Sequence, residues 1–260
     1  MAAILQTSYL QALHFYRQKY AQIPAIADQI DTVTSITVDL AAHKLPSRRF
    51  RMLGLDVASY SQAFLMNFGT PPQQIETELH RLDHLLHNFR NFVARTFGIW
   101  ALFNVPFMRR WHQLFPDETY LEIMAGNGLF TFSMQQFGQT SIATDDRSWG
   151  KTSLTASDPW VPIQTLDALT AIRHYGQTAT ALVMIWSQDH NPIDQQVLNC
   201  YRQYMAGKLF FVVGEKGAGG ATNSQGFWEQ ANLVQNKRIA GINQIFPHFD
   251  LIQDQVYCVR

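Results

Sequence analysis

Residues 120–130 read YLEIMAGNGLF. A short apolar run carrying one acid, Glu122, is followed by two glycines, Gly126 and Gly128, with one residue between them. Glycine lacks a Cβ atom, so its backbone can adopt φ > 0 and approach a ligand closely. The pattern indicates a strand, a tight turn and the start of a helix. Met124 stands where such a turn would be expected to carry a further glycine.

From about residue 118 onward, short apolar runs alternate with segments of helical length. Strands are expected at 120–124, 140–144, 161–166, 180–186, 208–214, 238–246 and 254–260. Strands that alternate with helices favour a parallel sheet covered on both faces. The last two runs are joined by a short connection, which favours an antiparallel pair at one edge. The sequence therefore predicts an α/β fold with a Rossmann-like, mostly parallel seven-stranded sheet that has an antiparallel edge.

The first part of the chain lacks this alternation and is expected to be helical. Residues 69–97 form the clearest predicted helix, with Thr70 as its cap, Pro71–Pro72 in its first turn and apolar residues on one face. We expect a helical N-terminal region over 1–115, serving as a lid or in dimerisation, and a Rossmann-like domain over 116–260.

Composition narrows the classes of function. The chain has 260 residues, of which 47% are hydrophobic, and Lys+Arg and Asp+Glu both number 20. This balance gives no sign of the one-sided basic surface that sequence-independent nucleic-acid binding needs. Cys200 and Cys258 lack a CxxC partner and are expected to be buried thiols in a reducing compartment. The apolar run 97–108 is shorter than the roughly 20 residues of a membrane span, and the N-terminus does not resemble a signal peptide, so we expect a cytoplasmic protein.

Polar residues follow the predicted strands. Ligands of open α/β sheets bind just beyond the carboxyl ends of the strands. Those positions carry Glu122, Ala125–Gly128, Asp145, Asp146, Asp167, Ala168, Trp186, Ser187, Gln188, Asp189 and Glu215. Asp145 lies nearer its strand than Asp146 and can accept the hydroxyls of a ribose, while Asp167 beside a free N–H can read an adenine edge. Together these residues predict an adenosine-containing cofactor.

The electrostatics of the first turn favour one such cofactor. Thr131 occupies the third position of the G-x-G-x-x-G fingerprint for dinucleotides, which the chain therefore lacks. The carboxylate of Glu122 would repel a pyrophosphate but suits a ligand with a cationic amino group. S-adenosylmethionine has such a group, together with a sulfonium, a ribose and an adenine, and it has no phosphate.

The segment LEIMAGNG resembles the first motif of class I S-adenosylmethionine-dependent methyltransferases, and ATDD, LDAL and LVMIW follow in the order of that family. The stretch from 182 to 229 also resembles a little-characterised group of methyltransferase-like proteins. The resemblance implies S-adenosylmethionine as cofactor. It assigns the methionyl part to Glu122, Ala125, Gly126, Asn127 and Gly128, the ribose to Asp145, the adenine to Asp167 and Ala168, and the surroundings of the transferred methyl to Trp186, Ser187 and Gln188.

Two positions depart from the family pattern. Met124 replaces the first glycine of the motif, and Ser187–Gln188 replaces a Pro-Pro pair. The second change removes the signature associated with amino-group methylation of nucleobases, which leaves a small molecule as the expected substrate. These departures also keep a non-catalytic binding or scaffold protein open as an alternative. An NAD(P)-dependent oxidoreductase is a further alternative, against which Glu122 and Thr131 argue.

Several residues have a simpler structural interpretation. Asp167 is also a good N-cap for the helix that follows it, and Trp186 is of a type more often found in a core. The candidates for a general base are Asp189, His190 and Glu215. His80, His84 and His87 share a helical face opposite the apolar stripe, which indicates a solvated surface, and we expect no metal. A homodimer is left open.

Overall fold

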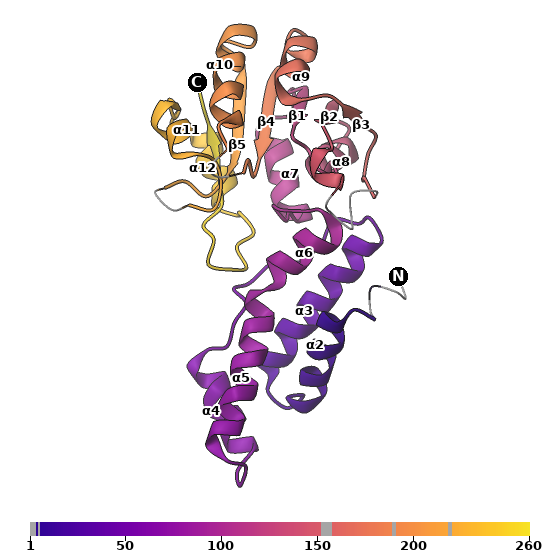
Figure 1. Ribbon diagram of the computed structural model, residues 1–260, viewed down its shortest axis with the longest axis vertical. Coiled ribbons are helices and arrows are strands. Elements are labelled where there is room, and N and C mark those ends of the chain that lie inside the picture. The colour runs from indigo at the N-terminus through magenta and orange to yellow at the C-terminus, as the bar shows by residue number, and fades with distance from the viewer. Residues whose placement is uncertain (1–3, 5, 152–157, 189–190, 218–219) are drawn as a thin grey trace.

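The computed structural model describes residues 4, 6–151, 158–188, 191–217 and 220–260. Two candidates for a general base, Asp189 and His190, lie outside the described residues. Figure 1 shows an elongated molecule in which a helical part projects away from an α/β part.

The helical part contains α2 (Ser8–Lys19), α3 (Pro24–Ala41), α4 (Val57–Met66), α5 (Pro72–His87) and α6 (Phe89–Phe97). The single helix expected over 69–97 is two helices that meet at Asn88. The expected cap at Thr70 was wrong, because Pro71 is the N-cap residue and makes no side-chain capping bond. None of the helices in the described ranges combines the length and the apolar character that a membrane span needs.

The sheet has six strands in the described part of the chain, in the order β3-β2-β1-β4-β5-β6. They are β1 (Tyr120–Ile123), β2 (Ser141–Asp145), β3 (Ile163–Thr165), β4 (Ala181–Ile185), β5 (Leu209–Gly214) and β6 (Gln255–Cys258). β1 to β5 are parallel, and β6 runs antiparallel to β5. The order is that of a Rossmann sheet, whose strand order reverses between β1 and β4.

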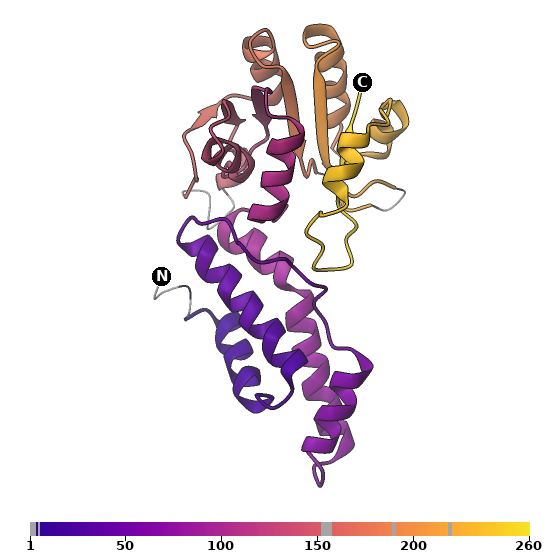
Figure 2. The ribbon, with the colours of Figure 1, turned by 180° about the vertical axis from the view of Figure 1, so that it is seen from behind.

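Helices cover both faces of this sheet. They are α7 (Val105–Leu114), α8 (Leu129–Gln136), α9 (Ala168–Tyr175), α10 (Ile193–Tyr204), α11 (Gln225–Gln230) and α12 (Lys237–Asn243), with a 3₁₀ turn at Ser148–Lys151. Alternate strand residues enter different cores: Phe211 packs with α7, α8 and α12, whereas Phe210 packs with α9, α10 and α11. The view from behind shows α7 and α12 in front of the sheet (Figure 2).

The seventh strand expected at 238–246 was wrong, because this segment forms the helix α12 and the loop after it. Ile239 and Ile242 are three residues apart and both buried, and Asn236 caps the helix by accepting the N–H of Arg238. β6 consequently pairs with β5 instead of with that segment. The side chain of Asn243 makes hydrogen bonds that a further strand beside β6 would make. It donates to the carbonyl of Val256 (2.9 Å) and accepts the N–H of Val256 (2.8 Å).

The apolar core is continuous between the two parts. One buried cluster runs from Leu13 in α2 through Phe89 in α6 and Trp111 in α7 to Phe211 in the sheet. The ring of Trp111 contacts those of Phe130 and Phe211 at centroid distances of 5.1 and 5.2 Å. Although α7 falls within the first 115 residues, it packs as a covering helix of the sheet.

Candidate functional site

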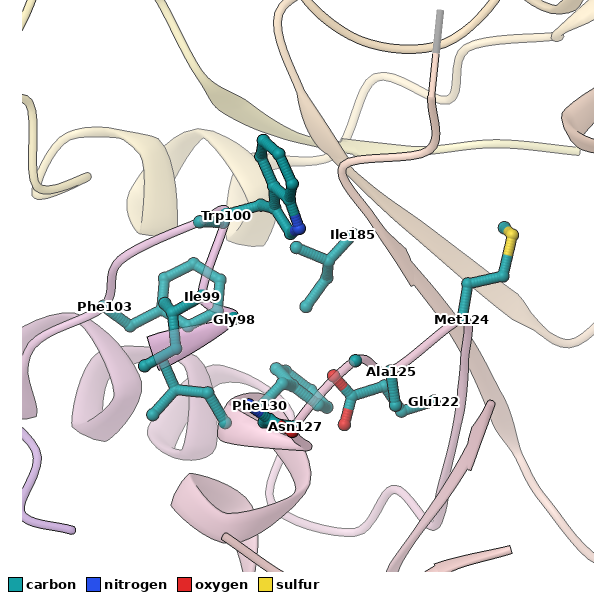
Figure 3. Close-up of a pocket in the computed structure, with 13 residues that line it drawn as sticks. Gly98, Ile99, Trp100, Phe103, Glu122, Met124, Ala125, Asn127, Phe130 and Ile185 are labelled. Carbon is teal, nitrogen blue, oxygen red and sulfur yellow. The ribbon is translucent and has the colours of Figure 1, made fainter. Parts of the chain in front are cut away.

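A small pocket lies beyond the carboxyl end of β1 (Figure 3). Its volume is about 50 Å³. The segment after α6 contributes Gly98, Ile99, Trp100, Ala101 and Phe103; the turn from β1 to α8 contributes Glu122, Met124, Ala125, Gly126, Asn127, Leu129 and Phe130; and β4 contributes Ile185. Among the lining residues that the structure describes, Glu122 is the one with an ionisable side chain. The pocket is therefore an apolar enclosure around one carboxyl group.

The backbone of the turn is left-handed at three positions. φ is 50° at Met124, 56° at Gly126 and 77° at Gly128. A residue with a Cβ atom in this region costs about 1–2 kcal/mol, so Met124 keeps the glycine-like conformation without being a glycine. Its side chain packs with the core under α9 and α10, and Figure 3 shows its thioether pointing away from Glu122. The methionine therefore leaves the pocket side of the turn open.

Glu122 is held inside the pocket wall. Its side chain is 3% exposed, and its Oε2 accepts the N–H of Thr131 at 2.9 Å. Burial raises the pKa of Glu122 to about 7, the Thr131 contacts lower it in part, and the charge of Asp145 adds to the rise. Thr131, the residue that departs from the dinucleotide fingerprint, thus donates its backbone N–H to Glu122. The hydroxyl of Thr131 forms a hydrogen bond with that of Ser141 at 2.8 Å.

Asp145 lies buried at the end of β2 and is engaged by its own chain. Its Oδ2 accepts the N–H of Gly126 at 2.9 Å. Its Oδ1 accepts the N–H of Arg147 at 2.6 Å and the indole N–H of Trp149 at 2.9 Å. Three of roughly four acceptor positions of the carboxylate are used. A ligand with two vicinal hydroxyls would therefore have to displace one of these donors, and the indole is the one on a side chain.

Asp167 and Ala168, which were predicted to bind adenine, have structural roles. Asp167 caps α9 by accepting the N–H of Thr170 at 2.9 Å and its hydroxyl at 2.6 Å. These hydrogen bonds lower the pKa of Asp167. Ala168 is buried in the core beneath α9. In the structure Asp167 therefore serves as the N-cap of α9, which was its simpler interpretation. The role of Asp167 in binding adenine stays a prediction.

The turn is interlocked with the end of α6. Asn127 donates from its side chain to the carbonyl of Phe97 at 2.7 Å. A Cβ atom on Gly98 would come within 2.6 Å of the Asn127 side chain, and one on Gly128 within 2.6 Å of Val161. At Gly126 the nearest contact would be the Gly98 carbonyl at 3.5 Å. Gly98 and Gly128 are therefore required by packing, whereas Gly126 has room around it.

Trp186 is not among the residues that line the pocket. It has a φ of 53°, and its indole N–H donates to Asp254 Oδ1 at 2.9 Å. One face of its ring meets the guanidinium of Arg90 at 4.9 Å, and it stacks with Trp100 at a centroid distance of 6.1 Å. Ser187 beside it is buried, while Gln188 is exposed and bridges to Thr222. Neither of them is among the residues that line the pocket.

Arg90 joins these groups into a buried cluster. Its guanidinium forms hydrogen-bonded ion pairs with Asp250 and Asp254, and its Nη1 also donates to the carbonyl of Trp100 at 3.1 Å. No sequence pattern had pointed to Arg90, Trp100 or Asp254. The ion pairs of Arg90 join residues 160 and 164 positions apart, so no local pattern could reveal them, and the one local signal was a tryptophan inside the apolar run 97–108.

Glu215 does not line the pocket. Its two carboxylate oxygens accept the N–H groups of Ala221 (3.0 Å) and Gln253 (2.9 Å), which ties the loop after β5 to the segment before β6. The described residues contain no group of three or more His, Cys, Asp or Glu side chains placed to hold a metal ion. His80, His84 and His87 are exposed on α5.

No protein-family model and no curated protein sequence matches the chain. Solved structures that resemble it include magnesium protoporphyrin IX methyltransferase from Synechocystis PCC 6803, which is 8% identical, with 60% of this chain and 78% of that chain covered and a TM-score of 0.34. For a SAM-dependent methyltransferase from Archaeoglobus fulgidus the identity is 12%, the coverage 60% and 92%, and the TM-score 0.35. N,N-8-amino-8-demethyl-D-riboflavin dimethyltransferase from Streptomyces davawensis is 13% identical, with 99% of this chain and 71% of that chain covered and a TM-score of 0.36. At these TM-scores the likeness assigns no residue role to this chain.

Proposed function

We propose that this protein is an S-adenosylmethionine-dependent methyltransferase with a small-molecule acceptor. The observation that carries the proposal is a buried carboxyl group, Glu122, set under a turn with left-handed backbone at 124, 126 and 128. This turn lies beyond the carboxyl end of a strand at the point where the sheet order reverses. The wall opposite it is apolar.

The donor set fits the cofactor. Ionised Glu122 would pair with the cationic amino group, and the backbone of Ala125–Gly128 would lie along the methionyl part. Asp145 would accept a ribose hydroxyl once the indole of Trp149 leaves it. The bound cofactor supplies a methyl group made electrophilic by a sulfonium. The chain's own contribution is to position the acceptor and exclude water, for which the rings and aliphatic side chains of the pocket wall are suited.

The pocket is too small for the cofactor unless part of its wall moves. Most small-molecule sites measure about 300–1,000 Å³, far above the 50 Å³ of this pocket. The segment from Gly98 to Phe103 closes the pocket opposite the turn. We propose that the side chains of Ile99 and Phe103 move aside when the cofactor enters, while Trp100 keeps its contact with Trp186. The helical region, to which this segment belongs, then acts as a lid, and the role in dimerisation stays a prediction.

Calorimetric titration tests the proposal. S-adenosylhomocysteine should bind to the full chain, and NAD should not. Asp145→Asn should weaken that binding by about 1.5–3 kcal/mol, because it removes a charge-assisted hydrogen bond. Asp146→Asn is the matched control: this neighbouring exposed carboxylate accepts the N–H of Ser148 and should be dispensable.

Two observations favour a second candidate, a non-catalytic protein that keeps the fold. The pocket is small, and Asp145 is already engaged by Gly126, Arg147 and Trp149. Binding of neither S-adenosylhomocysteine nor NAD to folded protein would select this candidate. Binding of NAD alone would select an oxidoreductase.

A further inference from the structure

An aromatic side chain lies exposed at the rim of the pocket. Trp100 follows α6 and lines the pocket, yet 53% of its surface is accessible to solvent. Figure 3 shows its indole beside Ile185, on the side of the pocket across from Glu122. A tryptophan has a large apolar surface to bury, so a half-exposed one at a pocket mouth leaves a ring face open to a ligand.

This exposed indole is fixed from behind. Its ring stacks on that of Trp186, with the centroids 6.1 Å apart and the planes 22° from parallel. Its backbone carbonyl accepts a hydrogen bond from Arg90 at 3.1 Å. The guanidinium of Arg90 in turn contacts the rings of Trp186 and Phe249, 4.9 and 4.8 Å from their centroids. Pairwise contacts thus link Phe249, Arg90, Trp186 and Trp100, and the last of these is half exposed to solvent.

Holding this stack is costly. Trp186 adopts a left-handed conformation, which a bulky residue keeps only where the surrounding structure imposes it. Arg90 is buried with two carboxylates, and burying three charges carries a large desolvation penalty. These features orient one indole whose outer face is unused, which is the arrangement of a preorganised recognition surface.

We propose that the outer face of Trp100 stacks on a planar aromatic ring of the methyl acceptor. This proposal names a substrate class for the proposed function and rests on it, because the ring belongs to a methyl acceptor only if the protein is a methyltransferase. Planar rings pair well with an indole in offset stacking, and the neighbouring Ile99 and Ile185 offer an apolar edge. A cation suits the face less, because the positive guanidinium of Arg90 already lies over the neighbouring ring of Trp186 and donates to the carbonyl of Trp100.

A pair of probes of similar size tests the proposal. Calorimetry compares 2-naphthol with its saturated analogue decahydro-2-naphthol on the full chain. The wild type should bind the aromatic probe roughly two- to twelvefold more tightly, which is the worth of one aromatic pair. Trp100→Leu should abolish this preference, and Trp100→Phe should keep part of it. Phe15→Leu is the matched control, because Phe15 is 57% exposed on α2, away from the pocket.

Equal affinity of the wild type for both probes would overturn the proposal, as would a preference that survives Trp100→Leu. Tight binding of tetramethylammonium without a preference for naphthol would replace it with a cation site. S-adenosylhomocysteine is titrated into the same samples. Its binding without a ring preference leaves the methyltransferase proposal intact and removes this one. A ring preference without its binding removes the methyltransferase proposal and leaves Trp100 as a site for planar rings that are not methyl acceptors.

Discussion

The two sides of the pocket are held by different kinds of contact. On the β1–β2 side, Glu122 accepts the N–H of Thr131 in the first turn of α8, and Asp145 accepts N–H groups from the turns after β1 and β2. On the β4 side, Trp186 is fixed by Arg90 and Asp254, which come from distant parts of the chain. The first side is local in sequence, since its donors lie 2, 9 and 19 positions from the carboxylates that accept from them. The second is a tertiary assembly whose members depend on one another.

The largest effect is expected from breaking the tertiary side. Asp254→Ala leaves Nη1 of Arg90 and the indole N–H of Trp186 without their carboxylate partner inside the protein. The free energy of unfolding should fall by about 3–5 kcal/mol, measured by urea denaturation. Asp254→Asn keeps an acceptor for the indole and should cost less. A loss below about 1 kcal/mol for the alanine variant would show that the cluster is not the anchor described.

On the local side, Glu122 gives a pH-dependent effect. Its pKa is about 7 in the folded protein, above its usual value of 4.5, because burial favours the neutral acid. The folded state therefore binds the proton more tightly than the unfolded state. Stability should fall as pH rises from about 4.5 to 7, by up to about 3 kcal/mol from this group.

Glu122→Gln should remove the part of the pH dependence of the unfolding free energy that comes from Glu122. The stability of the variant relative to the wild type should therefore rise between pH 5 and pH 8. Urea denaturation at the two pH values measures the difference. Parallel stability curves for variant and wild type would contradict the raised pKa. In the wild type, affinity for S-adenosylhomocysteine should also rise with pH through about 7, because the ionised carboxylate pairs with its amino group.

The two glycines of the turn should differ in their tolerance of alanine. Gly128→Ala adds a Cβ atom 2.6 Å from Val161 and should cost more than about 2 kcal/mol. Gly126→Ala meets only an ordinary contact at 3.5 Å and should cost about 1–2 kcal/mol of backbone strain. Thermal unfolding of the two variants gives the ranking. The opposite order would mean that the turn does not have the described conformation.

The smallest effect is a gain. Trp149→Phe removes the indole donor from Asp145 and leaves an acceptor position for a ribose hydroxyl. Affinity for S-adenosylhomocysteine should improve by about 0.5–1.5 kcal/mol, measured by calorimetry. Weaker binding by this variant would assign the indole to the ligand instead of to Asp145.

The same contrast explains what the sequence could predict. The five parallel strands could be located because most of them are short apolar runs and because turn or cap residues such as Gly126 and Asp167 follow them. The error at 238–246 arose because the segment is rich in β-branched and aromatic residues, although Ile239 and Ile242 have the three-residue spacing of a helix and Asn236 caps it. Arg90 and Asp254 could not be paired from sequence, since no local pattern records a contact across 164 positions.

The side chain of Asn243 has a consequence for assembly. An edge strand with unpaired N–H and C=O groups is a template for strand addition by another chain and so for aggregation. At β6 this template is interrupted, because the amide of Asn243 occupies both groups of Val256, and residues 232 and 234 pair with those near the chain end. The helix that replaces a seventh strand thus also blocks sheet extension. A homodimer of this protein would have to form through a different surface.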